Sequence, residues 1–198
     1  MAHNIAIFAS GTGSNAKKII EYLQEKNGSS SIHVQLIVSN RADAKVLHIA
    51  AEHHIPSLII NRKEFYQSED ILKIFNRYSI DFVVLAGFLW LIPSYLVDAY
   101  KKRIVNIHPA LLPKYGGKGM YGMNVHRAVK EAGETETGIT IHFVNEHYDE
   151  GAIIFQAKCP VTSEDTPEQI AQNVQQLEHR FFPRIIENTI LGEVDKNG

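Results

Sequence analysis

Asparagine and histidine two residues apart, Asn106 and His108, are the pair in this 198-residue chain best suited to chemistry. They lie in the run VNIHP at 105–109, an expected strand, and alternate residues of a strand share one face. Pro109 directs the chain out of the sheet, so His108 is expected at the carboxyl end of the strand, where parallel sheets bind ligands. An amide that stabilises an oxyanion, beside an imidazole that moves a proton, suits addition to a carbonyl group. The alternative is that both side chains only cap the strand.

A carboxylate near His108 would help to keep the imidazole protonated, because a nearby negative charge raises a histidine pKa. The stretch 145–151 contains three acidic residues, Glu146, Asp149 and Glu150. It joins two late strands and can fold over the same edge of the sheet. The residues alone leave all three open, either as partners of His108 or as solvated turn residues.

A glycine-rich turn, SGTGSNA at 10–16, follows the first predicted strand and opens the first helix. Its glycines would let the backbone approach a phosphate, which the free N–H groups and the helix dipole then bind. A dinucleotide site would also need an acidic residue at the end of the second strand, but no acid occurs there before Asp43. The turn therefore predicts a phosphate site without the rest of a dinucleotide. The alternative is a tight turn in which Ser14 caps the helix.

Short β-branched runs alternate with segments of helical period, as in α/β proteins. We expect strands at 4–8, 34–38, 57–60, 81–86 and 103–108, helices at 15–26, 44–53, 64–77 and 92–99, and a loop at 27–31. After a glycine-rich stretch at 113–122 and a helix at 124–130, strands at 138–144 and 152–158 have no helix between them, which indicates antiparallel pairing.

The last helix is expected to begin after Thr166, with a capping box to Gln169, and to run towards Ile190 with a kink or break at Pro183. The whole pattern predicts a single α/β domain over residues 1–198. This domain is Rossmann-like and doubly wound around a mostly parallel sheet, with a mixed antiparallel C-terminal edge.

Composition narrows the class of protein. Hydrophobic residues make up 44% and charged residues 21%, as in ordinary globular chains, and the net charge of -2 at pH 7 offers no basic excess for nucleic acid. The longest apolar runs, such as 82–92, are too short to span a membrane, and no basic signal segment precedes the first strand. The single cysteine, Cys159, cannot form an internal disulfide. We expect a cytoplasmic protein that binds small molecules rather than nucleic acid or membranes.

The motifs and their order resemble those of the phosphoribosylglycinamide formyltransferases, folate-dependent enzymes of purine synthesis. The stretches that carry the resemblance are SGTGSN at 10–15, VVLAGF at 83–88, NIHPALLPKY at 106–115, GITIHFV at 138–144, DEGAIIFQ at 149–156 and QLEH at 176–179. They cover nearly the whole chain. The Asn-x-His-Pro-x-Leu-Leu-Pro run is typical of formyltransferases that use 10-formyltetrahydrofolate, and the Gly-Ser-Asn turn indicates the glycinamide ribonucleotide branch.

The resemblance implies a formyltransferase fold. It also implies transfer of the formyl group of 10-formyltetrahydrofolate to the amine of 5′-phosphoribosylglycinamide, a step of de novo purine biosynthesis. Asn106, His108 and Asp149 would be catalytic. The nucleotide would contact Gly13, Ser14, Asn15, Gly87, Gln175, Gln176, Leu177 and Glu178. The folate would contact Leu89, Trp90, Leu91, Ile92, Asn106, Asn145, Glu146, His147, Tyr148 and Asp149, with Arg62 or Lys63 at its glutamate tail.

On this resemblance the N-terminal half would bind the nucleotide phosphate, and the C-terminal half would bind the folate and carry catalysis. No metal would be required, and the enzyme would be a monomer or a weak homodimer. Trp90 either walls a pterin slot or packs in the core, and His142 is expected to be a structural neighbour of the site.

The stretch 115–123 is longer and richer in glycine than the corresponding loop in many members of the family. Two interpretations of this stretch stay open: it is a mobile lid in which Lys118 contacts phosphate, or it is a tolerated surface insertion. Four rival functions are weighed against formyl transfer to the nucleotide. A nicotinamide oxidoreductase would need the missing acid, and a folate hydrolase or a transfer-RNA formyltransferase is expected to carry an additional domain. A non-catalytic nucleotide-binding module remains as the fourth.

Overall fold

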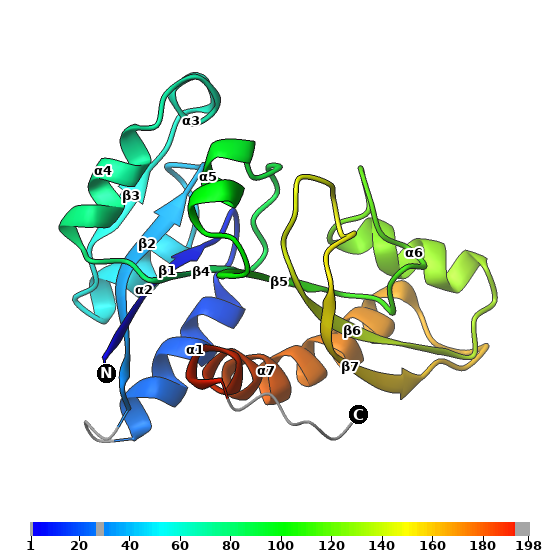
Figure 1. The fold of residues 1–198 in the computed structure, drawn as a ribbon. Coiled ribbons are helices and arrows are strands. Elements are labelled where there is room, and N and C mark those ends of the chain that lie inside the picture. The colour runs from blue at the N-terminus through cyan, green and yellow to red at the C-terminus, as the bar shows by residue number, and fades with distance from the viewer. Residues whose placement is uncertain (1, 27–29, 193–198) are drawn as a thin grey trace.

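The computed structural model describes residues 2–26 and 30–192, in which a sheet of seven strands is flanked by helices (Figure 1). The strands are β1 (His3–Phe8), β2 (Ile32–Ser39), β3 (Ser57–Ile59), β4 (Phe82–Leu85), β5 (Ile104–His108), β6 (Glu136–Phe143) and β7 (Ile153–Pro160). The helices are α1 (Ser14–Glu25), α2 (Val46–Glu52), α3 (Arg62–Gln67), α4 (Asp70–Arg77), α5 (Ser94–Ala99), α6 (Met123–Glu131) and α7 (Pro167–Leu191).

The strand order is β3-β2-β1-β4-β5-β6-β7, and the predicted fold class is confirmed. The first five strands pair in parallel, whereas β5–β6 and β6–β7 pair antiparallel. The order reverses between β1 and β4, so the connections after these two strands diverge at the carboxyl edge. Open α/β sheets bind their ligands at such a point.

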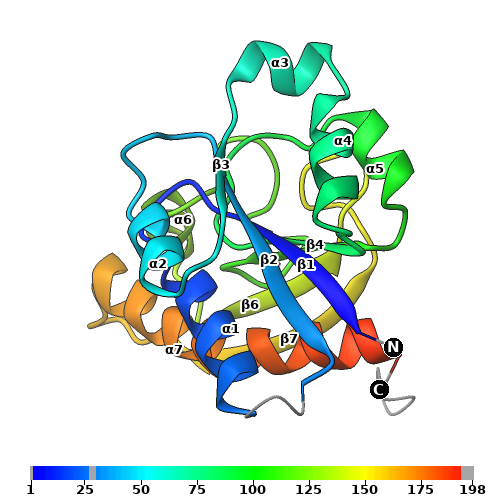
Figure 2. The same cartoon turned by 90° about the vertical axis from the view of Figure 1, so that its left-hand side faces the viewer.

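Strand β1 shows how the sheet separates two hydrophobic layers. Ile5 and Ile7 point to the face covered by α1, α2 and α7, while Ala6 and Phe8 point to the face covered by α3, α4 and α5 (Figure 2). Phe8 is fully buried and makes edge contacts with two phenylalanine rings on its side of the sheet, at 5.1 and 6.1 Å between centroids. Strands apolar on both faces are what a parallel sheet with two helical layers requires.

Two predictions about helices are wrong. The expected helix at 64–77 is two helices, because Ser68 adopts an extended conformation (φ −133°, ψ 158°) and its hydroxyl accepts a hydrogen bond from the backbone N–H of Asp70. Of the kink or break expected at Pro183, the break does not occur, since α7 continues to Leu191. Pro183 and its neighbour Phe182 are buried in α7, and this packing offsets the one backbone hydrogen bond that proline removes.

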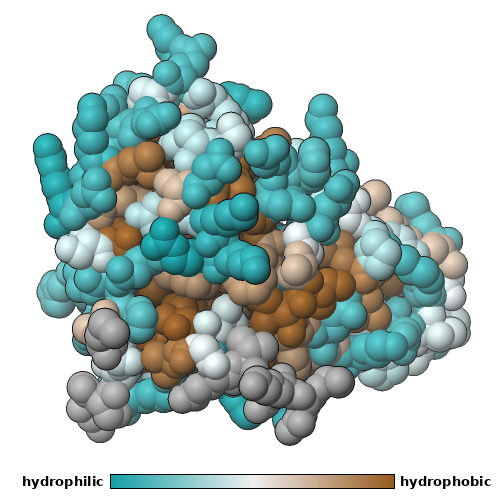
Figure 3. All heavy atoms as spheres, viewed as in Figure 1, coloured by the Kyte–Doolittle hydropathy of each residue, from teal (hydrophilic) through white to brown (hydrophobic). Residues whose placement is uncertain are grey.

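The start of α7 is as predicted: Thr166 and Gln169 form a complete capping box. Of the loop expected at 27–31, residues 27–29 lie outside the described residues. Within residues 2–26 and 30–192, the structure contains no helix of the length and hydropathy needed to cross a membrane. In the view of Figure 3, hydrophilic side chains surround the α3 end of the molecule, and hydrophobic surface shows between the helical layers.

Candidate active site

A cleft of about 880 Å³ opens at the carboxyl ends of β1, β4 and β5. Its walls are the turn after β1, the segment after β4, the glycine-rich stretch 117–123, the loop 147–149 and one face of α7. The cleft therefore brings together two motifs that are far apart in the sequence, the predicted phosphate turn at 10–16 and the Asn-x-His pair at 106–108. Of the stretch 115–123, residues 117–123 belong to this wall.

The turn after β1 is fixed by its backbone. Gly13 lies in the left-handed region (φ 73°), and a Cβ at this position would come within 2.7 Å of the Val46 side chain. The backbone N–H of Val46 also donates to the carbonyl of Gly11 at 3.2 Å. The alternative in which Ser14 caps the helix is wrong, because Gly13 is the N-cap residue and Ser14 is already helical. Residues 10–15 line the cleft, and no side chain caps the start of α1, so N–H groups of its first turn are available to an anion.

Helix α7 meets this turn through side chains. Asn15 donates from Nδ2 to Glu178 Oε2 at 2.8 Å, and Gln175 donates from Nε2 to the Ser14 hydroxyl at 3.3 Å. Burial raises the pKa of Glu178, and the hydrogen bond from Asn15 offsets this only in part. Asn15 Oδ1 is buried and has no partner among the described residues, which leaves it available to a donor on a ligand.

Strand β5 places Asn106 and His108 on the same face, as predicted, and β6 brings His142 beside them. Asn106 Nδ2 lies 3.1 Å from His142 Nε2 and donates to Asp149 Oδ1 at 3.4 Å. His142 Nδ1 donates to the Phe143 carbonyl at 2.8 Å, so in the neutral ring Nε2 is the nitrogen that accepts from Asn106. His142 is thus a neighbour of the site that orients the Asn106 amide.

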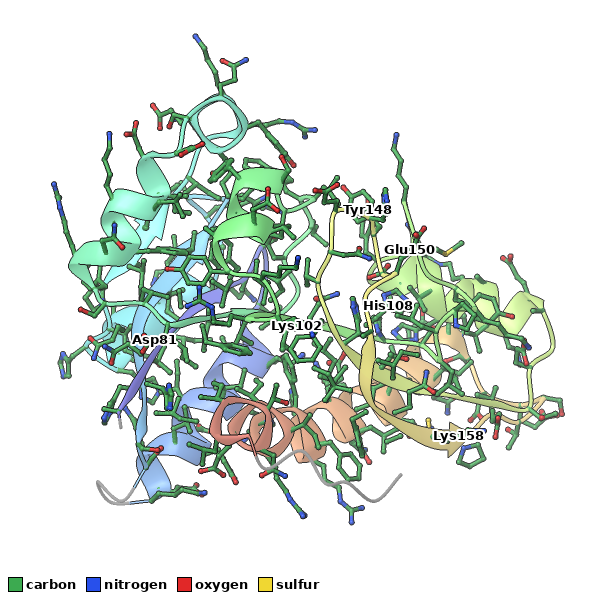
Figure 4. All side chains as sticks on the ribbon, in the orientation of Figure 1. Asp81, Lys102, His108, Tyr148, Glu150 and Lys158 are labelled. Carbon is green, nitrogen blue, oxygen red and sulfur yellow. The ribbon has the colours of Figure 1, made fainter. Side chains whose placement is uncertain are left out.

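The carboxylate beside His108 is Asp149, whose Oδ2 lies 3.5 Å from His108 Nδ1. The Asp149 side chain is 11% exposed, whereas Glu146 and Glu150 are exposed residues of the same loop. In Figure 4, Tyr148 and Glu150 lie at the tip of this loop, above His108. Of the three carboxylates that the sequence left open, only Asp149 is recorded in contact with the imidazole among the described residues.

The charges of His108 and Asp149 are coupled. Burial lowers the pKa of His108, and the opposite effects of Asp149 and the Tyr115 carbonyl only partly restore it. Burial alone would raise the pKa of Asp149, but the nearby rings of His142 and His108, at 3.6 and 3.5 Å from its oxygens, and the N–H of Gly117 together lower it. The surroundings therefore favour the ionised form of the Asp149 carboxyl group and the neutral form of the His108 imidazole.

The residues expected to contact folate divide into two groups. Leu89, Leu91, Ile92, Asn106, His147, Tyr148 and Asp149 line the cleft. Trp90, Asn145, Glu146, Arg62 and Lys63 are outside the lining of the described cleft. The Trp90 ring packs on Phe65 at 5.9 Å and on Phe88 at 6.1 Å between centroids, which is the core-packing alternative.

The two basic residues proposed for the folate tail are distinguishable. The Arg62 guanidinium lies over the Trp90 ring at 5.7 Å and over the Tyr66 ring at 5.6 Å, and is held in one orientation by both. No such ring contact is recorded for Lys63 within the described chain. Arg62 is therefore the better positioned of the two for binding a carboxylate.

On the nucleotide side, Gly13, Ser14, Asn15, Gly87, Gln175 and Glu178 line the cleft. Gln176 and Leu177 do not belong to the lining of the described cleft, and Leu177 packs instead against the hydrophobic core. The expected run 175–178 is four consecutive residues of a helix, and residues three apart share a face, so only Gln175 and Glu178 reach this wall.

Two ionisable residues of the described lining, His126 and Arg41, were not among the residues predicted from the sequence. His126 in the first turns of α6 is buried, and burial together with the nearby His108 lowers its pKa to about 4. Arg41 lies beyond the end of β2 and reaches the wall beside the phosphate turn. A histidine just after a glycine-rich stretch and a cation after the second strand were the available signals.

Comparison with known proteins matches residues 3–186 to the family model described as formyl transferase. The chain belongs to the formyl transferase family. This formyl transferase is 43% identical over 187 residues to the chloroplastic phosphoribosylglycinamide formyltransferase of Arabidopsis thaliana, with 92% of the chain but only 63% of that relative covered. The phosphoribosylglycinamide formyltransferase of Bacillus subtilis is 35% identical, with 93% of each chain covered.

Among solved structures, the phosphoribosylglycinamide formyltransferase of Anaplasma phagocytophilum superposes with a TM-score of 0.86 at 32% identity. The superposition covers 96% of this formyl transferase and 87% of that chain. The family and the formyltransferase fold are therefore established by both sequence and structure. The chain spans about three fifths of the length of the plant relatives, 63% and 59%.

Proposed function

We propose that this formyl transferase moves the formyl group of 10-formyltetrahydrofolate to the amine of 5′-phosphoribosylglycinamide. The observation that carries the proposal is one cleft that contains both the phosphate turn at Gly13–Asn15 and the group of Asn106, His108 and Asp149. Names of relatives support it: proteins that align over nearly all of this chain are phosphoribosylglycinamide formyltransferases.

The nucleotide end of the cleft suits a phosphorylated sugar. The N–H groups at the start of α1 would bind the 5′-phosphate, and Glu178, held by Asn15, would accept hydrogen bonds from ribose hydroxyls. Because burial raises the pKa of Glu178, hydroxyl groups that donate to its carboxylate would favour the ionised form. Gly87, with φ 78°, keeps the path from the sugar to His108 free of a side chain.

The reacting end suits addition of an amine to a formyl carbon. The amine would attack the carbon, and negative charge would develop on the formyl oxygen. Donors from Asn106 and protonated His108 would stabilise that charge, and Asp149 would stabilise the imidazolium. The proton lost by the attacking nitrogen would pass to the folate nitrogen as the bond between the formyl carbon and that nitrogen breaks and the carbonyl group re-forms.

The lowered pKa of His108 fits this sequence of events. An imidazole that is neutral in the free protein would take the proton that the attacking nitrogen loses as the oxyanion forms beside it, because the new charge raises the histidine pKa in the transition state. Its stabilisation is therefore greater in the transition state than in the ground state. Asp149 limits the cost of that protonation.

The folate would lie against Leu89, Leu91 and Ile92 with the loop 147–149 across from them, and Arg62 would bind its glutamate tail. We further propose that residues 1–198 act as one domain, with the nucleotide bound by the N-terminal half and catalysis carried by the C-terminal half. The single cysteine favours a reducing, cytoplasmic compartment, and we expect a monomer or a weak homodimer.

The test follows loss of the formyl group from 10-formyltetrahydrofolate by absorbance, with and without the nucleotide. Turnover that requires the nucleotide is the expected result. Turnover without it would reassign the chain as a hydrolase that gives formate. A folded protein that shows no turnover in either case would favour a nucleotide-binding module without catalysis.

A further inference from the structure

The stretch 115–123 touches the reacting group directly. His108 Nε2 donates to the Tyr115 carbonyl at 2.7 Å, and the backbone N–H of Gly117 donates to Asp149 Oδ2 at 2.9 Å. Both bonds come from backbone in the left-handed region, with φ 56° at Tyr115 and 91° at Gly117. A tyrosine adopts this conformation only where its surroundings hold it, so contacts outside the cleft are needed.

Glu134 supplies such a contact. The Tyr115 hydroxyl donates to Glu134 Oε1 at 2.8 Å, and Lys114 Nζ donates to the same oxygen at 2.8 Å. Glu134 follows α6 and precedes β6, and it is not one of the residues that line the described cleft. Its side chain is 24% exposed, whereas that of Lys114 is 68% exposed, so the tyrosine bond is the better shielded of the two. Tyr115 thus connects a carboxylate outside the cleft to the imidazole inside it.

The carbonyl of Tyr115 determines which nitrogen of His108 carries the permanent proton. A carbonyl oxygen can only accept, so Nε2 is the donor. Nδ1 is then the nitrogen that gains and loses a proton, and it is the one that lies 3.5 Å from Asp149. If Tyr115 moved away, the neutral ring would be free to place its proton on Nδ1 instead, and the protonatable nitrogen would point away from the carboxylate.

We propose that Glu134 is a positioning residue for His108 and acts through the hydroxyl and carbonyl groups of Tyr115. The proposal rests on the proposed function, because it adds to that reaction a residue outside the cleft. It also explains why the stretch begins with tyrosine: the ring spans the distance between the surface carboxylate and the backbone at the site.

Several groups act on the His108 charge from the elements packed around it. Burial lowers the His108 pKa most, His142 on β6 lowers it further, and Asp149 after β6 and the Tyr115 carbonyl raise it. His126 on α6 is coupled to His108 as well. If the Tyr115 carbonyl moves away, only Asp149 still raises the His108 pKa, so this pKa should fall further below its ordinary value.

The first test is an NMR titration of histidine-labelled protein without substrates, which reports the tautomer and the pKa of His108. In the wild type we expect the neutral ring to be almost entirely the Nε2–H tautomer. Glu134→Ala and Tyr115→Phe should both introduce the Nδ1–H tautomer and lower the pKa. Glu134→Gln should restore the wild-type spectrum, because its amide oxygen still accepts from the tyrosine hydroxyl.

The matched control is Glu136→Ala, which removes a carboxylate two residues away that pairs with Lys158 on β7 at 2.7 Å. This variant should leave the His108 tautomer and pKa unchanged. Equal spectra for the wild type, Glu134→Ala and Tyr115→Phe would overturn the proposal. Equal changes in Glu134→Ala and Glu136→Ala would do the same, since they would report a general loosening of the fold.

The second test is kinetic. For an enzyme active on the nucleotide, Glu134→Ala should lower kcat about five-fold, the size expected of one ordinary hydrogen bond, with little change in KM. The double variant with Tyr115→Phe should be no slower than either single variant, because both break the same connection. Wild-type protein that fails to transfer formyl groups contradicts the proposed function, while the NMR result still decides the role of Glu134.

Discussion

The two ends of the cleft are built in different ways. The phosphate turn after β1 is shaped by backbone: a glycine with φ 73°, a side chain packed where a Cβ would be, and the first turn of α1. The reacting end is shaped by polar side chains and loop backbone around His108, Asp149 and Tyr115. The turn depends on steric fit of the backbone, whereas the reacting end depends on which polar atoms carry protons. Substitutions at the turn should therefore affect stability and nucleotide binding, and substitutions at the reacting end should affect kcat.

The largest effect is expected at the reacting end. His108→Ala and Asp149→Asn should lower kcat by about 10²- to 10⁴-fold, because each removes a group that acts on the developing charge. Binding of the nucleotide should be nearly unchanged, since we propose that its phosphate binds at the other end of the cleft.

Isothermal calorimetry measures nucleotide affinity, and steady-state kinetics on the same preparations measures kcat. Either variant with wild-type kcat would show that His108 and Asp149 do not carry the chemistry. Weakened nucleotide binding in parallel with kcat would mean that the two ends are not independent.

At the phosphate end, Gly13→Ala should destabilise the fold by about 2 kcal/mol and weaken nucleotide binding, because alanine disfavours φ 73° and its Cβ meets Val46 at 2.7 Å. Denaturant unfolding and calorimetry measure the two effects. Gly11→Ala is the control for stability, since nothing lies within 4 Å of a Cβ at that position. Equal stability losses in the two variants would contradict the steric explanation.

Far from both ends, Glu187 joins α7 to α1. Lys26 donates to its carboxylate at 2.6 Å and the Tyr22 hydroxyl at 2.7 Å. Burial raises the pKa of Glu187, but these bonds lower it by more, to below its ordinary value of 4.5. Its contribution to stability is therefore fully present above about pH 4.5 and is lost as the pH falls through the lowered pKa.

Glu187→Gln should reduce the free energy of unfolding by about 2 kcal/mol at neutral pH, with a smaller difference in acid. Denaturant curves over a range of pH measure this. Glu21→Gln breaks an exposed pair with Lys18 and should have no resolvable effect. A stability difference for Glu187→Gln that does not shrink in acid would exclude the ionised carboxylate as its source.

The smallest effect is expected at the folate tail. Arg62→Ala should raise the KM for a folate with a glutamate tail a few-fold, about 1 kcal/mol for a surface charge, and leave kcat unchanged. Lys63→Ala should change neither, because no ring holds its ammonium group in the described structure. An effect confined to Lys63→Ala would reverse the assignment.

Much of this molecule was readable from its sequence. Alternation of strand and helix predicted the mostly parallel sheet. The single elements were predictable because they depend on local patterns, such as the NIAIF run of β1 and the capping box at Thr166. The split of the third predicted helix was missed, because it depends on one serine, Ser68, which is extended and whose hydroxyl accepts from the backbone N–H of Asp70. Local competition of that kind has almost no signature in hydrophobic periodicity.

At the site, strand alternation correctly paired Asn106 with His108, but it could not choose among three carboxylates in one loop. That choice depends on the left-handed backbone of Asp149 (φ 58°) and on the N–H of Gly117, which comes from a different segment. The contact of the Tyr115 carbonyl with His108 could not be predicted from the sequence for a further reason. Every residue has a backbone carbonyl, so residue types do not indicate which carbonyl will contact the histidine.

The most direct measurement follows the formyl carbon itself. With ¹³C-formyl-labelled 10-formyltetrahydrofolate and the glycinamide nucleotide, carbon NMR distinguishes donor, formate and formylated nucleotide in one sample. We predict that the label passes to the nucleotide amine with wild-type protein and stays on the donor with His108→Ala. Label that appears as formate, or transfer that continues without His108, would contradict formyl transfer by the group of Asn106, His108 and Asp149.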